Sequence, residues 1–155
     1  MPSRRELIQM SAEEISAYLR SQPRMIVVTN GPGGMPHPVP MNFGLDEIDR
    51  IHITTFRKSQ KVKNLERDPR ATLLVESGDS YTNFKSVIAY ADAEIIDEPA
   101  TIREAVRKLK WSVATEVRSE EVGQDISASF TKRVIVRFTP FRYVSWDHGK
   151  LGGKY

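Results

Sequence analysis

Hydrophobic and polar residues alternate along several short stretches of the chain, which is the pattern of half-buried β-strands. The clearest stretch is 87–96, where valine and alanine occupy every second position and face away from tyrosine, aspartate and glutamate. Alternation or a run of β-branched residues predicts further strands at 25–29, 36–44, 50–56, 70–76, 133–138 and 141–146. We expect the first three strands to form a meander and Pro140 to break the last two apart.

Apolar residues spaced three or four positions apart predict three helices between these strands. The first helix begins after Ser11, because a serine followed three residues later by Glu14 forms a capping box, and it ends before Pro23. The other two helices are expected at 59–67 and 99–117.

Short turns join most of the strands, and only two connections are long enough to be helical crossovers. A doubly wound parallel sheet is therefore disfavoured, and a small closed antiparallel barrel of six to seven strands with peripheral helices fits best. The fold class is mainly β (α+β). A length of 155 residues suits one domain over 1–155, with an N-terminal helical segment at 1–24 and a C-terminal tail at 145–155.

Composition excludes several classes of protein. The chain has no cysteine, which rules out disulfides, thiolate metal sites and cysteine nucleophiles. Its three histidines lack metal-ligand spacing, so we expect no metal site. No P-loop, G-x-G-x-x-G or G-x-S-x-G motif is present. Without a signal core or a long apolar run, a cytoplasmic protein with no membrane contact is expected.

The basic excess is concentrated in one segment. Residues 57–70 carry a net charge of +4, whereas the whole chain sums to +3, so the remainder is slightly acidic. That distribution indicates a local anion site rather than a general polyanion binder. Binding of nucleic acid through 57–70 is disfavoured, because acidic residues interrupt the segment and few aromatic residues accompany it.

Within that segment, Arg57, Lys58 and Lys61 lie where a strand leads into a helix. Cations are unfavourable at a helix N-terminus, because that end already carries partial positive charge. An anion bound there by Lys61, the Ser59 hydroxyl and backbone N–H groups would remove the conflict. The alternative is that the basic side chains face water or pair with acids of the turn at 46–49.

Two further features allow either a ligand or an ordinary structural role. The strand at 37–42 carries alternate prolines, so its open edge could contact a ligand or could simply be a blunted edge strand. Trp146, beside the glycine-containing tail, could cover a planar ligand or anchor the core.

The residues also resemble a known family. The Lys61-x-x-Asn64-Leu65-x-x-Asp68-Pro69-Arg70 stretch, preceded by the runs 36–41 and 51–55, is similar to the pyridoxamine 5'-phosphate oxidase-like superfamily of flavin and deazaflavin oxidoreductases. The resemblance covers roughly 14–96, and the ending at 145–151 is similar to that of some members. It implies a split β-barrel and a homodimer, with FMN or coenzyme F420 in a groove between two barrels.

The resemblance assigns roles to particular residues. Lys61 matches the lysine that binds the cofactor phosphate, and further cofactor contacts are expected from Val39, Pro40, Met41, Thr54, Thr55, Arg57, Lys58 and Ser59. Tyr81, Phe84 and Trp146 are candidates for closing the substrate side from the second subunit. No side chain need act as a catalytic acid or base, because the cofactor carries the hydride.

The expected function is therefore transfer of a hydride to or from a small organic substrate. A pyridoxamine phosphate oxidase itself is disfavoured, because its substrate-phosphate motif is not visible in 141–155. The alternative is a non-catalytic flavin- or haem-binding split barrel that serves storage, sensing or a stress response.

Overall fold

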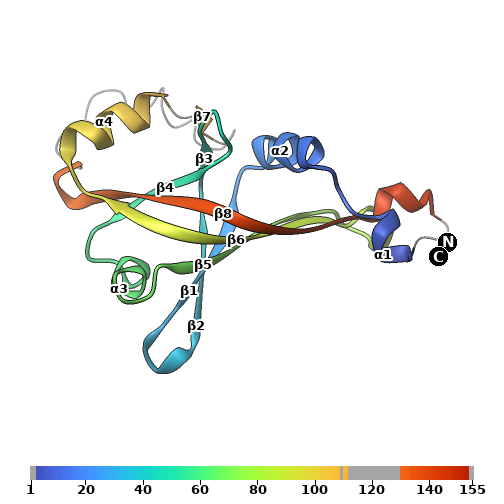
Figure 1. Ribbon diagram of the computed structural model, residues 1–155, viewed down its shortest axis with the longest axis horizontal. Helices are drawn as coiled ribbons and strands as arrows, with labels where there is room; N and C mark the ends of the chain where they lie inside the picture. Colours follow the sequence, from blue (N-terminus) through green and yellow to red (C-terminus); the bar gives the residue numbers. More distant parts are fainter. Residues whose placement is uncertain (1–2, 109, 112–129, 154–155) are drawn as a thin grey trace.

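The computed structural model describes residues 3–108, 110–111 and 130–153. In this part of the chain eight strands form one antiparallel sheet, in the order β2-β1-β5-β6-β8-β4-β3-β7 (Figure 1). The strands are β1 (Met25–Asn30), β2 (Pro36–Met41), β3 (Gly44–Leu45), β4 (Ile51–Phe56), β5 (Arg70–Ser77), β6 (Lys85–Ile96), β7 (Lys110–Trp111) and β8 (Arg133–Asp147). The α-helices are α1 (Arg4–Leu7), α2 (Ala12–Ser21), α3 (Gln60–Arg67) and α4 (Pro99–Lys108), and short 3-10 turns include η2 (Tyr81–Asn83) and η4 (His148–Leu151).

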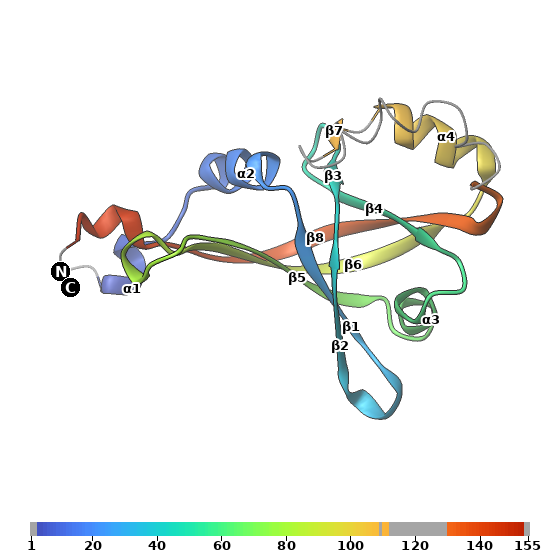
Figure 2. The ribbon, with the colours of Figure 1, turned by 180° about the vertical axis from the view of Figure 1, so that it is seen from behind.

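The antiparallel split barrel with peripheral helices is thereby confirmed. The count exceeds the expected six to seven because β3 and β7 are two-residue strands, too short to produce a periodic pattern. The expected closure is wrong for the described residues: their hydrogen-bonded ladder runs from β2 to β7 without joining its ends, and the sheet is strongly curled (Figure 2).

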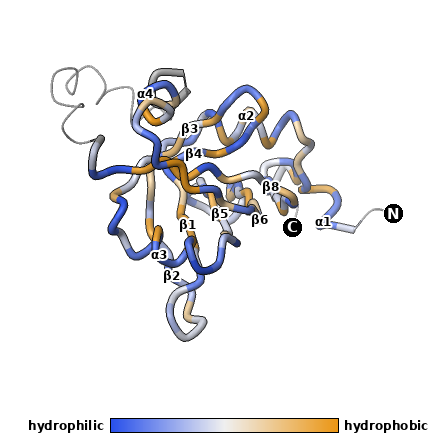
Figure 3. The backbone as a smooth tube through the Cα atoms, turned by 60° about the vertical axis from the view of Figure 1, so that its left-hand side comes forward, coloured by the Kyte–Doolittle hydropathy of each residue, from blue (hydrophilic) through white to orange (hydrophobic). Residues whose placement is uncertain are grey.

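The core lies on the inner face of the curled sheet. Cross-strand partners Val27, Leu73 and Ala89 are all buried there, as the alternation at 87–96 predicted. Helix α2 covers one side of this core with Ile15, Tyr18 and Leu19, and the orange hydrophobic stretches in Figure 3 follow the strands beneath it. The predicted capping box is present, since the Glu14 amide donates to Ser11 Oγ at 3.2 Å and the Ser11 amide to Glu14 Oε2 at 2.7 Å.

The predicted break at Pro140 is wrong, because β8 is one continuous strand. Pro140 lies opposite Ala91 and Arg142 lies opposite Tyr90, so Phe141 is an extra residue that forms a β-bulge. A bulge tolerates proline because the ladder is already interrupted there.

The predicted meander is also wrong. β1 and β2 form a hairpin, but β4 pairs with β3 and β8 instead of β2. Prolines at every second position of β2 provide no amide donors along one side, so no third strand can form a ladder there and β2 ends the sheet.

The helix expected at 99–117 begins as predicted but ends at Lys108. The two residues Lys110–Trp111 pair instead with Gly44–Leu45 as β7. The rest of the expected helix, at 112–117, lies outside the described residues.

Candidate functional site

The strongest functional feature is a buried lysine at the start of α3. Lys61 is only 9 % exposed, and its ammonium Nζ donates to Thr55 Oγ1 at 2.9 Å. Thr55, buried at the end of β4, lies 3.4 Å (Oγ1 to Oγ) from Ser59, the residue that precedes α3. No carboxylate in the described part of the chain pairs with Lys61, and burial lowers the pKa of its ammonium.

A buried ammonium with hydroxyl neighbours and no counter-charge is unfavourable in an empty protein. The Ser59 hydroxyl accepts no hydrogen bond from the first turn of α3, so the amides of that turn also remain available to a ligand. An oxyanion placed among Lys61, Thr55 and Ser59 would satisfy all three groups. The donor set therefore fits a phosphate.

The other basic residues of the segment behave differently. Arg57 forms an ion pair with Asp97, at 2.9 Å from Nη1 to Oδ2, on the exposed surface. Two of the acids considered as partners are engaged elsewhere, since Asp46 pairs with Arg50 and Asp49 with Arg20. Lys58 is exposed, and Thr54 is half-buried on β4. The positive charge of Arg57 is therefore already neutralised by Asp97.

A further cation at this place was not predicted. The register of β4 with β8 sets Phe56 opposite Arg133, whose guanidinium carbon lies 4.4 Å from the Phe56 ring centroid. The Arg57 amide donates to the Lys132 carbonyl at 2.9 Å, which holds the start of β8 against the end of β4. Only knowledge of the strand pairing could have placed Arg133 here.

The rest of the family-like motif holds α3 in place. Asn64 is completely buried, and its Nδ2 donates to Thr29 Oγ1 on β1 at 3.0 Å. Asp68 accepts from Asn30 Nδ2 at 2.8 Å and from Arg70, and these hydrogen bonds hold the pKa of its carboxyl well below the usual range. Lys61 is thus presented by a helix that is fixed to the sheet.

The residues expected beside the cofactor ring lie on the edge strand β2. Val39 and Met41 are half-buried, with Met41 packed against the core, and Pro40 is exposed. His37 lies on the same side of β2 as Val39, and its buried Nδ1 has no hydrogen-bond partner among the described residues. This strand therefore offers an apolar surface together with an unsatisfied polar atom.

The expected substrate-side residues are not brought to Lys61 within one chain. Thr55 pairs with Val134 and Ser86 with Trp146, so the separation along β8 is roughly 40 Å at about 3.3 Å per residue. Tyr81 and Phe84 lie near Trp146, at the end of the long β5–β6–β8 ribbon where both chain termini lie (Figure 1). The Tyr81 ring packs on His148, with 4.7 Å between centroids.

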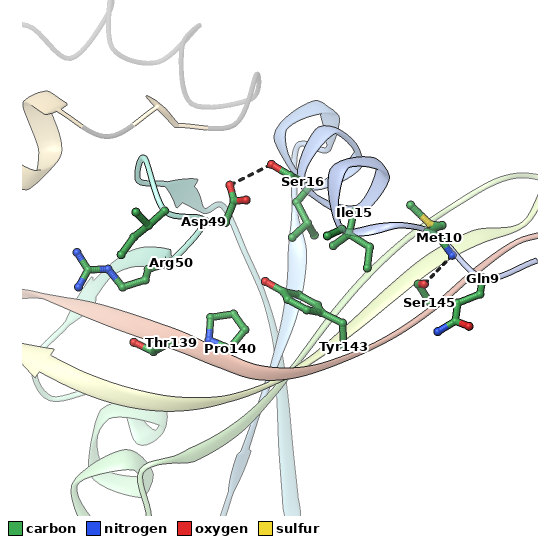
Figure 4. Close-up of a pocket in the computed structure, with 13 residues that line it drawn as sticks. Gln9, Met10, Ile15, Ser16, Asp49, Arg50, Thr139, Pro140, Tyr143 and Ser145 are labelled. Carbon is green, nitrogen blue, oxygen red and sulfur yellow. Dashed lines mark hydrogen bonds between the residues drawn. The ribbon is translucent and has the colours of Figure 1, made fainter.

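A cavity of about 450 Å³ lies elsewhere, between α2, the β3–β4 turn and β8 (Figure 4). It contains none of the residues predicted for the site. Its lining consists of Gln9, Met10, Ala12, Ile15, Ser16, Leu19, Ile48, Asp49, Arg50, Thr139, Pro140, Tyr143 and Ser145.

The described residues contain neither a metal-ion cluster nor a membrane-spanning helix. No three His, Asp or Glu side chains gather there in an arrangement able to hold a metal ion. Within the same part of the chain, no helix has the length and apolar character needed to cross a bilayer.

Residues 11–147 match the family model of pyridoxamine 5'-phosphate oxidase, and the chain belongs to that family. It is similar to the crystal structure of a conserved hypothetical protein, Rv2991, from Mycobacterium tuberculosis. The two share 34 % identity over 99 % of this chain and 95 % of that one, with a TM-score of 0.81. No curated protein matches the chain.

More distant structures share the fold. An F420 reductase is 18 % identical over 92 % of this chain and 98 % of its own, with a TM-score of 0.58. HutZ, the heme storage protein of Vibrio cholerae, is 12 % identical over 86 % of this chain and 94 % of its own, with a TM-score of 0.60. One architecture therefore occurs in proteins named for different tasks.

Proposed function

We propose that the protein is a homodimeric, cytoplasmic oxidoreductase that binds FMN or coenzyme F420 and passes a hydride to or from a small organic substrate. The observation that carries the proposal is the Lys61 ammonium, buried beside two hydroxyls with no described carboxylate as partner. Both cofactors contain a phosphate, which is the anion that this donor set lacks. Membership of the family supports the same choice.

In this proposal Lys61, Thr55 and Ser59 hold the phosphate, while β2 borders the ring. Family resemblance adds Thr54, Arg57 and Lys58 near the phosphate and Val39, Pro40 and Met41 near the ring. When bound, a flavin or deazaflavin supplies the hydride chemistry. The task of the chain is then to bind, orient and exclude water.

A second copy of the chain is proposed because the outer face of the sheet is apolar and only half-buried. Ile26, Leu74, Ile88 and Val144 lie side by side on it across four strands. Packing a second copy against this row would bury it. It would also let Tyr81, Phe84 and Trp146 of that copy close the substrate side of the groove.

The phosphate assignment is tested by titrating the protein with FMN and with riboflavin, which lacks the phosphate. Lys61→Ala should weaken FMN binding by about 1.5–3 kcal/mol, the worth of a hydrogen bond to a charged group, and leave riboflavin binding unchanged. Lys63→Ala is the matched control, because Lys63 is exposed on the same helix. Equal losses for both ligands would contradict the assignment.

The shared groove is tested by mixing Lys61→Ala with Trp146→Ala. Each variant alone should bind the cofactor poorly. After subunit exchange between twofold dimers, about a quarter of the sites should bind it again, because each of these sites combines an intact Lys61 from one copy with an intact Trp146 from the other. No recovery after exchange would place both residues in one protomer or remove Trp146 from the site.

A non-catalytic flavin- or haem-binding protein is the second candidate, favoured by the shared fold of a heme storage protein. Turnover distinguishes the two. If the reduced cofactor stays bound and no acceptor, including oxygen, reoxidises it, the protein is a binder.

A further inference from the structure

Two polar atoms of the residues lining the cavity beneath α2 have no hydrogen-bond partner in the described part of the chain. The hydroxyl of Tyr143 makes no hydrogen bond in the described part of the chain. Asp49 Oδ1 accepts hydrogen bonds from Ser16 Oγ, at 3.1 Å, and from Arg20. Asp49 Oδ2 has no described partner. Figure 4 shows the Tyr143 ring extending from β8 into the space bounded by Asp49 and α2.

The wall that presents Asp49 is rigid. Asp46 Oδ1 accepts the amides of Ile48 at 3.1 Å and Arg50 at 2.9 Å, and the Asp49 amide donates to the Asp46 carbonyl at 3.2 Å. Asp49 has a φ of 61°, the one positive value at a non-glycine residue among those described. Such a backbone persists where its surroundings enforce it, and the hydrogen bonds from Ser16 and Arg20 orient the carboxylate.

The rest of the lining limits what could enter. The floor is apolar, formed by Met10, Ile15, Leu19 and Pro140. The Arg50 guanidinium is turned away from Tyr143 and bound to Asp46, with Nε 2.7 Å from Oδ2, so it is not available to an anion (Figure 4). Burial and nearby Asp49 raise the pKa of Tyr143 to about 12, so the phenol keeps its proton. A volume of about 450 Å³ is of the size that holds small ligands.

We infer that this cavity is a second ligand site, for a small molecule with an apolar, ring-sized body and an N–H or O–H donor, neutral or cationic. The donor reaches Asp49 Oδ2 and Tyr143 Oη, while the body replaces water over the floor. Carboxylates are excluded, because they would meet Asp49 without a free cation. The site shares no residue with the proposed phosphate site, so the two stand or fall separately.

Protein-observed NMR titration with benzyl alcohol, toluene and benzoate tests the chemistry on one common ring. Benzyl alcohol should shift the amides of Asp49, Tyr143 and Ser145 and bind about five- to tenfold tighter than toluene, with benzoate weakest. Tyr143→Phe, checked for folding by its spectrum, should bring benzyl alcohol close to toluene and leave toluene unchanged.

Two alanines of α2 give a matched steric test. Ala12→Phe, in the cavity lining, should abolish binding of all three probes, while Ala17→Phe, exposed and outside the lining, should not. The inference is overturned if benzoate binds best, if Tyr143→Phe has no effect on benzyl alcohol, or if no saturable binding occurs.

Discussion

Replacing Lys61 by methionine should stabilise the empty protein while it impairs cofactor binding. Methionine is close to lysine in length and keeps the buried volume, so little packing is lost. The variant loses one charge-assisted hydrogen bond, to Thr55 at 2.9 Å, which contributes about 1.5–3 kcal/mol. It also removes the cost of burying an ion, which amounts to several kcal/mol where burial is deep.

Because Lys61 is 9 % exposed and has no described carboxylate partner, we expect the second effect to be the larger. The lowered pKa of Lys61 agrees with this expectation, because it means that the folded protein favours the charged ammonium less than the unfolded chain does. The free energy of unfolding should rise by about 1 kcal/mol, or roughly 2–4 °C in Tm for a chain of this size. Urea denaturation of the cofactor-free protein at pH 7 measures the change.

The pH dependence checks the cause. Below the folded-state pKa of Lys61 the ammonium is charged in both states, and the penalty is fully present; above 10.5 it is neutral in both, and the penalty is gone. The difference between the variant and the wild type should therefore shrink as pH rises toward 10.5. A Lys61→Met protein less stable than the wild type at pH 7 would show that the lysine is a structural hydrogen-bond donor, and the anion-site reasoning would fail.

Other outcomes follow from single contacts. Asn64→Ala should lower the free energy of unfolding by about 2–4 kcal/mol in urea titrations, because it opens a cavity and leaves buried Thr29 unsatisfied. Burial lowers the pKa of His52 against the opposing effect of Asp46, so stability should fall as pH drops below 6.5, and His52→Gln should flatten that dependence in melts at pH 7.5 and 5.5. Ile88→Lys should give a monomer by sedimentation velocity; a dimer that survives it would exclude the outer face as the interface.

Local signals in the sequence were enough for most elements. The capping box of Ser11 and Glu14 and the alternation at 87–96 involve residues only a few positions apart, and both features are present in the structure. By the same rule Ser3 and Glu6 cap the short helix α1, which was not predicted although its signal was present.

Pairing between distant strands was beyond such signals. Whether β4 adjoins β2 or β8 depends on which barrel edge the chain reaches after Met41, and no periodicity records that choice. Similarly, a proline at position 140 is compatible with a strand break and with a β-bulge. Only the pairing of Pro140 with Ala91 in the sheet distinguishes these two possibilities.

The same contrast between local and long-range information applies to the proposed phosphate site and the proposed cavity site. Lys61 could be found from sequence because cations at a helix start conflict with the helix dipole, a clash visible within a few residues. Tyr143 and Asp49 could not, because the cavity between them forms only when three separate segments meet. Sequence patterns therefore reveal a site carried by one turn of chain more readily than a site assembled from several segments.

The arrangement of α3 explains how an unfavourable lysine is kept in place. Asn64 and Asp68 anchor the helix to β1 through side-chain hydrogen bonds, and these contacts do not depend on Lys61. The stabilising contacts therefore lie one and two turns beyond Lys61, the residue that we expect to destabilise the cofactor-free protein. Such a separation would let the fold tolerate the proposed anion site, and a bound ligand would then stabilise the protein by RT ln(1 + [L]/Kd). Within the family-like motif, Asn64 and Asp68 therefore make structural contacts, while the proposed binding chemistry rests on Lys61.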